Sequence, residues 1–310
     1  MSWFDSRRVE RTVRPGEPQR PDFGRTLPFV ALHVACVAVV WVGWSPVALA
    51  ACAALYALRM FAITGFYHRY FSHRTFKTSR AAQLVFAVLG NSATQRGPLW
   101  WAAHHRRHHQ HSDEPEDVHS PVQHGFWWSH VGWITSRANF PTHRDAVRDL
   151  ARYPELRFLD RFDTLVPIAT GAALFGLGWA LDVLWPGLGT SASQMLVWGY
   201  VVSTVLLLHA TFTINSLSHV FGTRRFATPD ASRNNPLLAL LTFGEGWHNN
   251  HHRYPASARQ GFFWWEYDLT YYGLWLLARV GLVWDLKPVP AEVRREGRER
   301  GRRAPPSAAA

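Results

Sequence analysis

The chain is poor in the residues on which several common redox sites depend. It has two cysteines, Cys36 and Cys52, in 310 residues. These two residues can build neither a disulfide framework nor a typical iron–sulfur cluster. The sequence also contains no His-Pro-Gly-Gly haem signature and no G-x-G-x-x-G nucleotide fingerprint. Any redox chemistry of this chain would therefore need electrons from a separate protein.

The chain also lacks a recognisable cleavable signal peptide, since its N-terminus is polar and charged. Lysine is nearly absent, with Lys77 and Lys287 alone, yet the formal net charge is +11. Such a charge can indicate a nucleic-acid partner. Here arginines that face an anionic membrane surface explain it better, so we expect no nucleic acid to bind.

Four long apolar runs are the main hydropathy feature that is present. They cover about residues 27–43, 47–66, 165–185 and 193–214. Each run approaches the ~20 residues that a helix needs to cross a ~30 Å hydrocarbon core. Only short connections separate the members of each pair. We therefore predict an all-α integral membrane protein with four transmembrane helices in two hairpins, rather than a soluble protein with buried helices.

The arginines predict the orientation of these helices. Six arginines lie in the first 26 residues, whereas the short connections within the two hairpins contain no arginine or lysine. The positive-inside rule then places both termini and the site described below on the cytoplasmic side of the cell (inner) membrane. The expected organisation is a basic leader over 1–26, one domain over 27–288 with a helical cap formed by 67–163 and 215–288, and a disordered tail over 289–310.

Nine of the 17 histidines form three boxes and one separate residue. In a helical His-x-x-His-His box, residues i, i+3 and i+4 share one face, so their ring nitrogens can converge. Neutral imidazole is the commonest protein ligand for transition metals. Because nine imidazoles exceed the needs of one ion, the pattern predicts two metal ions in a shared site within the cap. The nine are His68, His73, His105, His108, His109, His219, His248, His251 and His252.

Acidic residues lie close to two of the boxes. Glu245 precedes the third box and can either accept the distal N–H of a liganding histidine or complement the helix dipole. Asp113, Glu116 and Asp117 follow the second box. They can play the same supporting role or be solvated turn residues.

An all-imidazole site without an obvious pair of carboxylate ligands suits iron, copper or zinc. Beside apolar helices, it should face a lipid chain, and iron-dependent oxygen activation can attack an unactivated C–H bond there. A membrane hydroxylase of fatty acids or alkanes is an alternative. A His-rich metal transporter or a metal-binding membrane protein without catalysis is less favoured, because a transporter should place its ligands near the middle of the bilayer.

At these residues the chain resembles the membrane-bound fatty acid desaturases, most closely a bacterial form of the acyl-CoA Δ9 (stearoyl-CoA-type) branch, over about residues 27–288. The HxxxxH, HxxHH and HNxHH boxes occur in order. Further matches are Asn215-Ser-Leu-Ser-His219, Ser129-His-Val-Gly-Trp133 and Gly244-Glu-Gly-Trp-His248. The resemblance implies that the nine histidines bind two ferrous ions, that Asn215 holds a water ligand, and that O2 is the co-substrate. The implied product is a cis double bond at Δ9.

The resemblance also implies a set of substrate residues. Gln95, Trp101 and Thr211 match the residues that bend the acyl chain at the metals, and Tyr56 matches the residue that closes the tunnel. Met60 stands where animal members often have a small residue. We therefore expect a tunnel suited to chains shorter than stearoyl.

The residues that contact the head group in animal members match less well. An Arg-Asp pair is replaced by Ala103-His104, and an Arg-Lys pair by Arg137-Ala138, so only Arg137 is retained as a substrate contact. We expect an acyl-CoA substrate, with phospholipid or acyl carrier protein as alternatives. The electron donor implied by the family is a separate protein, such as ferredoxin or a b-type cytochrome with its reductase, docked on the arginine-rich face.

Overall fold

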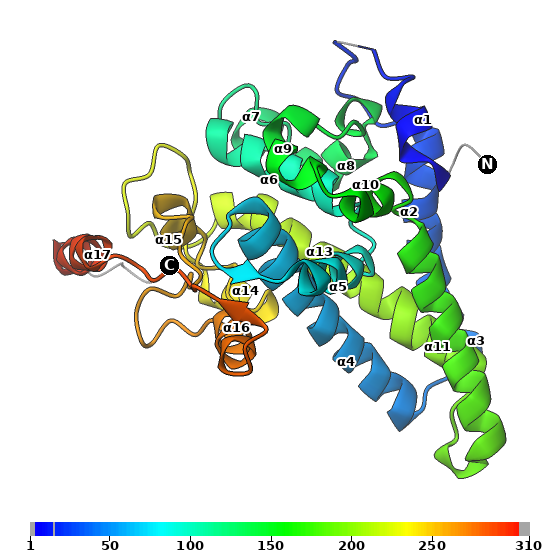
Figure 1. The fold of residues 1–310 in the computed structure, drawn as a ribbon. Coiled ribbons are helices and arrows are strands. Elements are labelled where there is room, and N and C mark those ends of the chain that lie inside the picture. The colour runs from blue at the N-terminus through cyan, green and yellow to red at the C-terminus, as the bar shows by residue number, and fades with distance from the viewer. Residues whose placement is uncertain (1–3, 15, 304–310) are drawn as a thin grey trace.

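The computed structural model describes residues 4–14 and 16–303 and shows a mostly helical molecule (Figure 1). Three continuous helices are long and apolar enough to cross a membrane: Pro46–Ser72, Leu165–Leu184 and Ala192–His219. A further apolar helix, Thr26–Val42, is shorter. Three of the predicted spans thus have membrane length, while the arrangement of four spans in two hairpins stays a prediction.

The first pair of apolar segments consists of α2 (Phe23–Ala35), η2 (Cys36–Ala38) and α3 (Val39–Val42), followed by α4 (Pro46–Phe61) and the π-helical η3 (Ala62–Ser72). Its turn follows from local chemistry. Gly43 adopts a positive φ of 65°, which ends α3. Ser45 accepts a hydrogen bond from the Ala48 N–H, and Pro46 occupies the first helical position, so together they start α4.

The second pair consists of α11 (Leu165–Leu184), then η7 (Pro186–Leu188), α12 (Ala192–Gln194), the π-helical η8 (Met195–Val202), α13 (Ser203–Asn215) and η9 (Leu217–His219). Its two arms meet closely at Gly178. A Cβ atom added there would lie 2.6 Å from the Ser191 carbonyl oxygen and 2.8 Å from the Met195 Cβ, so the approach requires glycine.

A buried arginine joins the two pairs of apolar helices. Arg59 on α4 is 1% exposed and donates to Thr204 Oγ1 at 2.7 Å and to Ser203 Oγ on α13. It also donates to the Leu55 carbonyl one turn away. A guanidinium inside an apolar bundle is tolerated when its N–H groups have such partners. These contacts fix α4 against α13.

The cap gathers at one end of the long helices, as Figure 1 shows for α6 and α8 to α10. Its first part contains α5 (Arg80–Asn91), α6 (Pro98–His111), α7 (Pro121–His124), η4 (Trp128–Gly132), α8 (Trp133–Thr135), η5 (Arg137–Asn139), η6 (Arg144–Val147), α9 (Arg148–Ala151) and α10 (Pro154–Arg161). Its second part contains α14 (Pro236–Leu241), α15 (His248–Arg253) and α16 (Leu269–Arg279). The largest buried apolar cluster includes Phe71, Leu99 and Leu156, and therefore joins η3, α6 and α10.

The described part of the chain also contains two short β-strands, which the prediction of an all-α protein did not include. Strand β1 (Lys77–Thr78) pairs antiparallel with β2 (Val283–Trp284) and joins the segment after η3 to the C-terminal part of the chain. Between them in the chain, α16 has 11 residues. At ~1.5 Å per residue it is too short to cross a bilayer, which agrees with the prediction that residues 215–288 add no further membrane span.

The C-terminal tail departs from its prediction. Residues 291–303 were expected to be disordered, but they form α17 (Ala291–Arg303). Val289 and Val293 are buried against Phe226, Phe262 and Phe263, and this burial gives the charged helix a partner. An ion pair of 2.6 Å between Arg253 and Glu296 adds to the contact. Residues 304–310 lie outside the described part of the chain.

The basic leader docks on the cap through α1 (Ser6–Glu10). Asp5 pairs with Arg161 at 2.6 Å and Glu10 pairs with Arg144 at 2.8 Å. The hydroxyl of Ser6 donates to Asp163 at 3.0 Å. The described leader residues therefore lie on the cap, while residues 1–3 and 15 are outside the described part.

Asp160 supports the helix that carries the second histidine box. Its Oδ1 accepts the Trp100 N–H at 2.7 Å, which satisfies a free donor in the first turn of α6. Its Oδ2 accepts the Thr142 hydroxyl at 3.0 Å. Burial raises the pKa of Asp160 from 3.8 to about 6, against the lowering effect of these hydrogen bonds. The buried carboxylate is therefore costly at neutral pH.

We expect Asp160→Asn to stabilise the folded protein at neutral pH. Because the folded pKa is raised, stability is highest below the unfolded value of about 4 and is lost as pH rises through about 6. Removing this ionisation should recover on the order of 2–3 kcal/mol at pH 7.5. Thermal unfolding in detergent from pH 5 to 8 tests this, with exposed Asp145→Asn as control. A Tm that still falls with rising pH in Asp160→Asn would contradict the assignment.

Candidate metal centre and substrate pocket

The predicted ligands form two adjacent clusters of imidazoles. In the first cluster, the possible ligand nitrogens of five histidines all lie within 4.8 Å of one another. The Nε2 atom of His251 is 3.1 Å from that of His68 and 2.8 Å from that of His109. The members of this cluster are His68, His73, His105, His109 and His251, from η3 and its C-terminal end, α6 and α15.

The second cluster contains the other four predicted ligands. Their possible ligand nitrogens also lie within 4.8 Å of one another. The Nε2 atoms of His219 and His248 are 3.0 Å apart. The members are His108, His219, His248 and His252, from α6, η9 and α15.

Each His-x-x-His-His box is divided between the clusters. In α6, His105 and His109 are four residues apart and join the first cluster, while His108 faces the second. In α15, His248 and His252 are likewise four residues apart and join the second cluster, while His251 faces the first. The expectation that all three nitrogens of a box meet at one point is thus wrong. Helix geometry instead places the boxes between two points, since neighbouring residues i+3 and i+4 differ in direction by about 100°.

Burial favours the neutral form of several of these imidazoles. Desolvation, reinforced by the neighbouring imidazoles, holds the pKa of His73, His105, His109 and His251 well below the ordinary value. The pKa of His252 falls to about 4 because desolvation outweighs the effect of Asp230. A neutral imidazole keeps one nitrogen lone pair free, which is the form that binds a metal.

Carboxylates hold the outer nitrogens of the second cluster. Nδ1 of His219 lies 2.9 Å from Asp113 Oδ2, and Nδ1 of His108 lies 2.9 Å from Asp117 Oδ2. Although burial opposes ionisation, the hydrogen bond with His219 lowers the pKa of Asp113 to about 2. An ionised carboxylate fixes the proton on Nδ1 and leaves Nε2 as the lone pair that points into the cluster. The acidic residues after the second box therefore include two partners, while Glu116 is exposed.

Two further carboxylates contact a ligand histidine, one in each cluster. Glu245, the predicted supporting residue, contacts His68 Nδ1 and pairs with Arg69 at 3.1 Å. Asp230 lies 2.8 Å from His252 Nδ1. Asp230 was not predicted from the sequence, because it lies in a loop far from any histidine box. The one feature of the sequence that could have indicated Asp230 is that it is an acidic residue between His219 and the third box.

The clusters have the properties of a metal site. The His252 side chain is 2% exposed, and its Nε2 has no hydrogen-bond partner within the described residues. Leaving such an atom buried and unpaired costs free energy, as does crowding several lone pairs of neutral imidazoles together. A cation held by the second cluster would remove both penalties, and one held by the first cluster would relieve the crowding. The donor set is all imidazole, which fits iron, copper or zinc.

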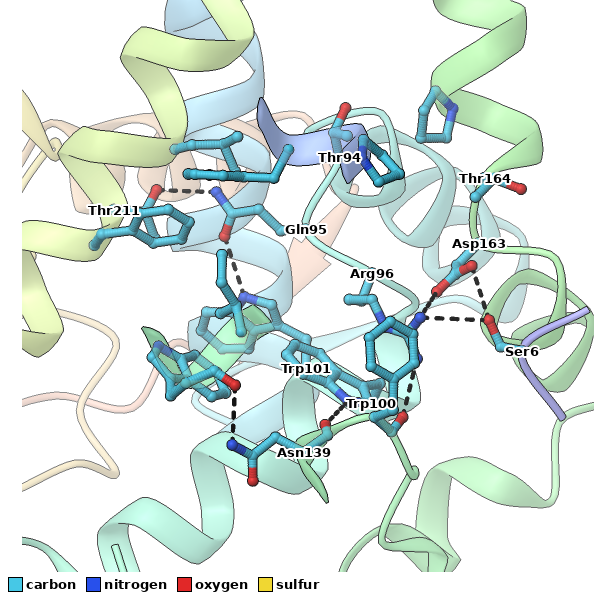
Figure 2. A pocket seen from close by; sticks show the side chains of 18 of the residues that line it. Ser6, Thr94, Gln95, Arg96, Trp100, Trp101, Asn139, Asp163, Thr164 and Thr211 are labelled. Atoms are coloured by element: carbon cyan, nitrogen blue, oxygen red, sulfur yellow. Dashed lines mark hydrogen bonds and ion pairs between the residues drawn. The ribbon is translucent and has the colours of Figure 1, made fainter. Parts of the chain in front are cut away.

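A pocket of about 700 Å³ reaches the first imidazole cluster at His105. Three predicted substrate residues meet on its wall (Figure 2): Gln95 donates to Thr211 Oγ1 at 3.0 Å and accepts from Trp101 Nε1 at 3.4 Å. His105 of the first cluster and Asn215 also line the pocket. The mostly apolar wall therefore ends beside the first cluster, where Gln95, Trp101 and Thr211 form one hydrogen-bonded group.

The other three predicted substrate residues do not line this pocket. The Tyr56 hydroxyl donates to the Leu241 carbonyl at 2.7 Å, and Met60 is fully buried in the main apolar cluster. Arg137 donates to the Thr12 carbonyl of the leader at 2.9 Å. The roles expected for Tyr56, Met60 and Arg137 stay predictions.

The structure also places residues at the site that the sequence analysis did not select. His119 lines the pocket and stacks on Trp133, with 4.8 Å between ring centroids. Gln260 donates to Glu245 Oε2 at 2.9 Å, next to the first cluster. Neither residue belongs to a histidine box, so its position in the sequence did not indicate that it lies at the site.

Comparison with known proteins agrees with this geometry. A family model described as fatty acid desaturase matches residues 42–287. An sn-1 stearoyl-lipid 9-desaturase of Anabaena variabilis is 37% identical over 282 residues, which are 89% of this chain and 97% of the relative. A chloroplastic palmitoyl-monogalactosyldiacylglycerol delta-7 desaturase of Arabidopsis thaliana is 36% identical over 283 residues, covering 89% and 71%. An icosanoyl-CoA 5-desaturase of Limnanthes douglasii is 35% identical over 280 residues, covering 89% and 74%.

Proposed function

The chain belongs to the fatty acid desaturase family and is an oxidoreductase, and from this premise we propose that it forms a cis Δ9 double bond in a long-chain acyl group. The reaction would use O2 and two electrons at a di-iron centre. The observation that carries the proposal is the apolar pocket whose wall includes His105, one of the five imidazoles of the first cluster. The names of the relatives differ in acyl carrier and in bond position, so the acyl chain itself is the shared substrate feature.

The proposed metal ligands are the nine histidines of the two clusters, with Asn215 acting through a water molecule. Two ferrous ions, when bound, supply the oxygen activation that an unactivated C–H bond requires. The protein's own part is to hold the ligand nitrogens in place. The carboxylates of Asp113, Asp117, Asp230 and Glu245 orient the rings through their Nδ1 atoms, which raises the basicity of the metal-binding nitrogens.

The pocket residues would choose the bond. Gln95 is held between Thr211 and Trp101, so these three side chains form a fixed shoulder beside His105. An acyl chain has no polar group near its ninth carbon. A rigid bend at this shoulder would therefore set which carbons lie next to the metals. The apolar wall would also keep bulk water from the reacting carbons.

The same proposal includes the setting in the membrane. Three helices of membrane length support a membrane protein. We propose four spans, with both termini and the cap on the cytoplasmic side, because the arginines concentrate there. An external electron-transfer protein would dock on this arginine-rich face.

Expression in a host that makes no unsaturated fatty acids tests the proposal. Gas chromatography with mass spectrometry of total fatty acids should reveal new monounsaturated chains with the double bond at Δ9. Hydroxylated chains would identify the hydroxylase alternative. An unchanged fatty-acid profile, with the protein present and iron-loaded, would refute the proposed function.

We expect Met60→Ala to shift the chain-length preference toward longer substrates. The side chain is fully buried on α4, where the family resemblance places the end of the tunnel. Removing most of it leaves space for about two methylenes. Product profiles from hosts fed C14 to C20 acids measure the shift, with Met195→Ala, buried between α4 and α11, as control. Equal profiles for Met60→Ala and the unaltered protein would contradict the prediction.

A further inference from the structure

Three histidines outside the two imidazole clusters form a continuous hydrogen-bonded chain between α2, α13 and η4. Nε2 of His33 on α2 lies 2.9 Å from Nε2 of His209 on α13, and Nδ1 of His209 lies 3.0 Å from Nε2 of His130 on η4. At one end, Nδ1 of His130 lies 2.9 Å from the hydroxyl oxygen of Ser216, just after α13. At the other end, Nδ1 of His33 lies 2.7 Å from the carbonyl oxygen of Phe29. The chain thus links three elements that are distant in the sequence.

One carbonyl group determines where the protons lie along this chain. A carbonyl oxygen can only accept, so His33 carries its proton on Nδ1 and donates to Phe29. A neutral imidazole has a single N–H, so Nε2 of His33 accepts from His209, and Nδ1 of His209 accepts from His130. Nδ1 of His130 then accepts from the Ser216 hydroxyl, which turns away from the helix carbonyl four residues earlier. Every contact is satisfied by neutral rings, the form that an apolar bundle favours.

The chain lies directly behind the wall of the acyl pocket. Phe29 of α2 and Phe212 of α13 both line the pocket, with 6.4 Å between their ring centroids. The ring of His33 lies 4.3 Å from that of Phe29, and the ring of His209 lies 6.0 Å from that of Phe212. Thr211, one of the three shoulder residues, precedes Phe212 on the same helix. The contact between His33 and His209 therefore sets how far the α2 wall stands from the shoulder.

Helix α2 has little else to hold it in this position. It packs mainly on η8 and α8. Its residues Val30 and Val34 do not line the pocket and are 45% and 64% exposed. Among the described side chains of α2, His33 is the one that hydrogen-bonds to another helix. A polar link of this kind inside an apolar bundle stabilises one relative placement of two helices.

We propose that His33 and His209 are positioning residues: together with His130 they hold the α2 wall at a fixed distance from the shoulder and so help to select the C–C bond that is desaturated. This inference rests on the proposed desaturase function and deepens it. An acyl chain between two fixed walls can bend at one place only. If the α2 wall moves outward, the chain can slide by a methylene, and a neighbouring bond then lies next to the metals.

Two substitutions of His33 separate the chain from the mere presence of a polar side chain. The amide of glutamine reaches the position of imidazole Nε2, so His33→Gln can still accept from His209. The amide of asparagine reaches only the position of Nδ1, so His33→Asn keeps at most the local contact with the Phe29 carbonyl. We expect His33→Gln to place the double bond as the unaltered protein does. We expect His33→Asn to give roughly a tenth or more of its product at neighbouring positions. Mass spectrometry of the fatty acids from the expression host locates the double bonds.

Hydrogen–deuterium exchange of the full-length protein in detergent gives a second readout that needs no turnover. Loss of the link to α13 should speed the exchange of α2 peptides about tenfold in His33→Asn, because local opening becomes easier. His33→Gln should exchange like the unaltered protein, and peptides of α11 should be unchanged in both variants. The matched control is Val34→Ala, since Val34 is the exposed neighbour of His33, and it should alter neither readout.

Equal results for His33→Asn and His33→Gln would overturn the inference. Faster exchange in His33→Asn with an unchanged double-bond position would show that the chain holds α2 but does not select the bond, which also overturns it. A host in which the unaltered protein forms no double bond would refute the proposed function. The exchange of α2 would still decide in that case whether the imidazole chain holds the wall.

Discussion

Purified His252→Ala should carry about one iron ion per chain instead of about two, and its double-bond formation should be abolished. His252 is one of four imidazoles in the second cluster, and its Nε2 is buried without a partner among the described residues. Alanine leaves three imidazoles there, while the five of the first cluster are untouched. Metal analysis of protein purified from iron-supplemented cells measures the first effect, and fatty-acid analysis of the host measures the second.

The matched control is His124→Ala. His124 is exposed on α7 and belongs to neither cluster, so its removal tests whether loss of any histidine lowers metal content nonspecifically. Iron content and desaturation should stay at the level of the unaltered protein. Two tightly bound ions in His252→Ala, or full desaturation, would show that the second cluster is not a metal site.

The histidine boxes could be predicted because the spacing of residues along a helix determines which side chains share a face. Residues four apart on a helix lie on one face, which is how His105 and His109 came to be selected together. The division of each box between two clusters was not predictable. It depends on how α6 and α15 are placed against each other, and such packing has no signature in local spacing.

Residues that support the ligands were harder to find. Glu245, Asp113 and Asp117 lie close to boxes in the chain, so proximity pointed to them. Asp230 reaches His252 only because the loop before α14 folds back over α15, and the backbone N–H of Ala231 in this loop also bonds to Asp113. A contact made by loop closure cannot be read from spacing.

At the C-terminus, amino-acid composition led to a wrong prediction of disorder. The segment that forms α17 is rich in arginine and glutamate, which is typical of a solvated tail. Its buried contacts come from Val289 and Val293, two apolar residues four positions apart. Their burial depends on aromatic residues of the distant segments around 226 and 262. A short apolar pair becomes informative only when its partner surface is known.

We expect Asp113→Asn to weaken iron binding by about 10- to 100-fold while the fold is retained. Asp113 Oδ2 accepts hydrogen bonds from His219 Nδ1 at 2.9 Å and from the Ala231 N–H at 2.7 Å. Asp113 has a positive φ of 62°, a conformation that asparagine tolerates well. An asparagine can keep both contacts through its carbonyl oxygen. Its amide group would stand where Oδ1 now accepts the Ser120 hydroxyl at 2.6 Å, so this one hydrogen bond would have to reverse its direction. The substitution otherwise removes the negative charge that makes the His219 ring more basic.

The pH dependence of this loss separates charge from structure. Because the pKa of Asp113 is lowered to about 2, its charge is present above the unfolded value and is lost only in strong acid. The difference in iron affinity between Asp113→Asn and the unaltered protein should then be constant from about pH 6 to 8. Chelator competition measures the affinity, and exposed Asp145→Asn serves as the charge-matched control. Equal affinities for Asp113→Asn and Asp145→Asn would mean that the carboxylate only supports the loop, since a positioning role through His219 requires the charge as well as the shape.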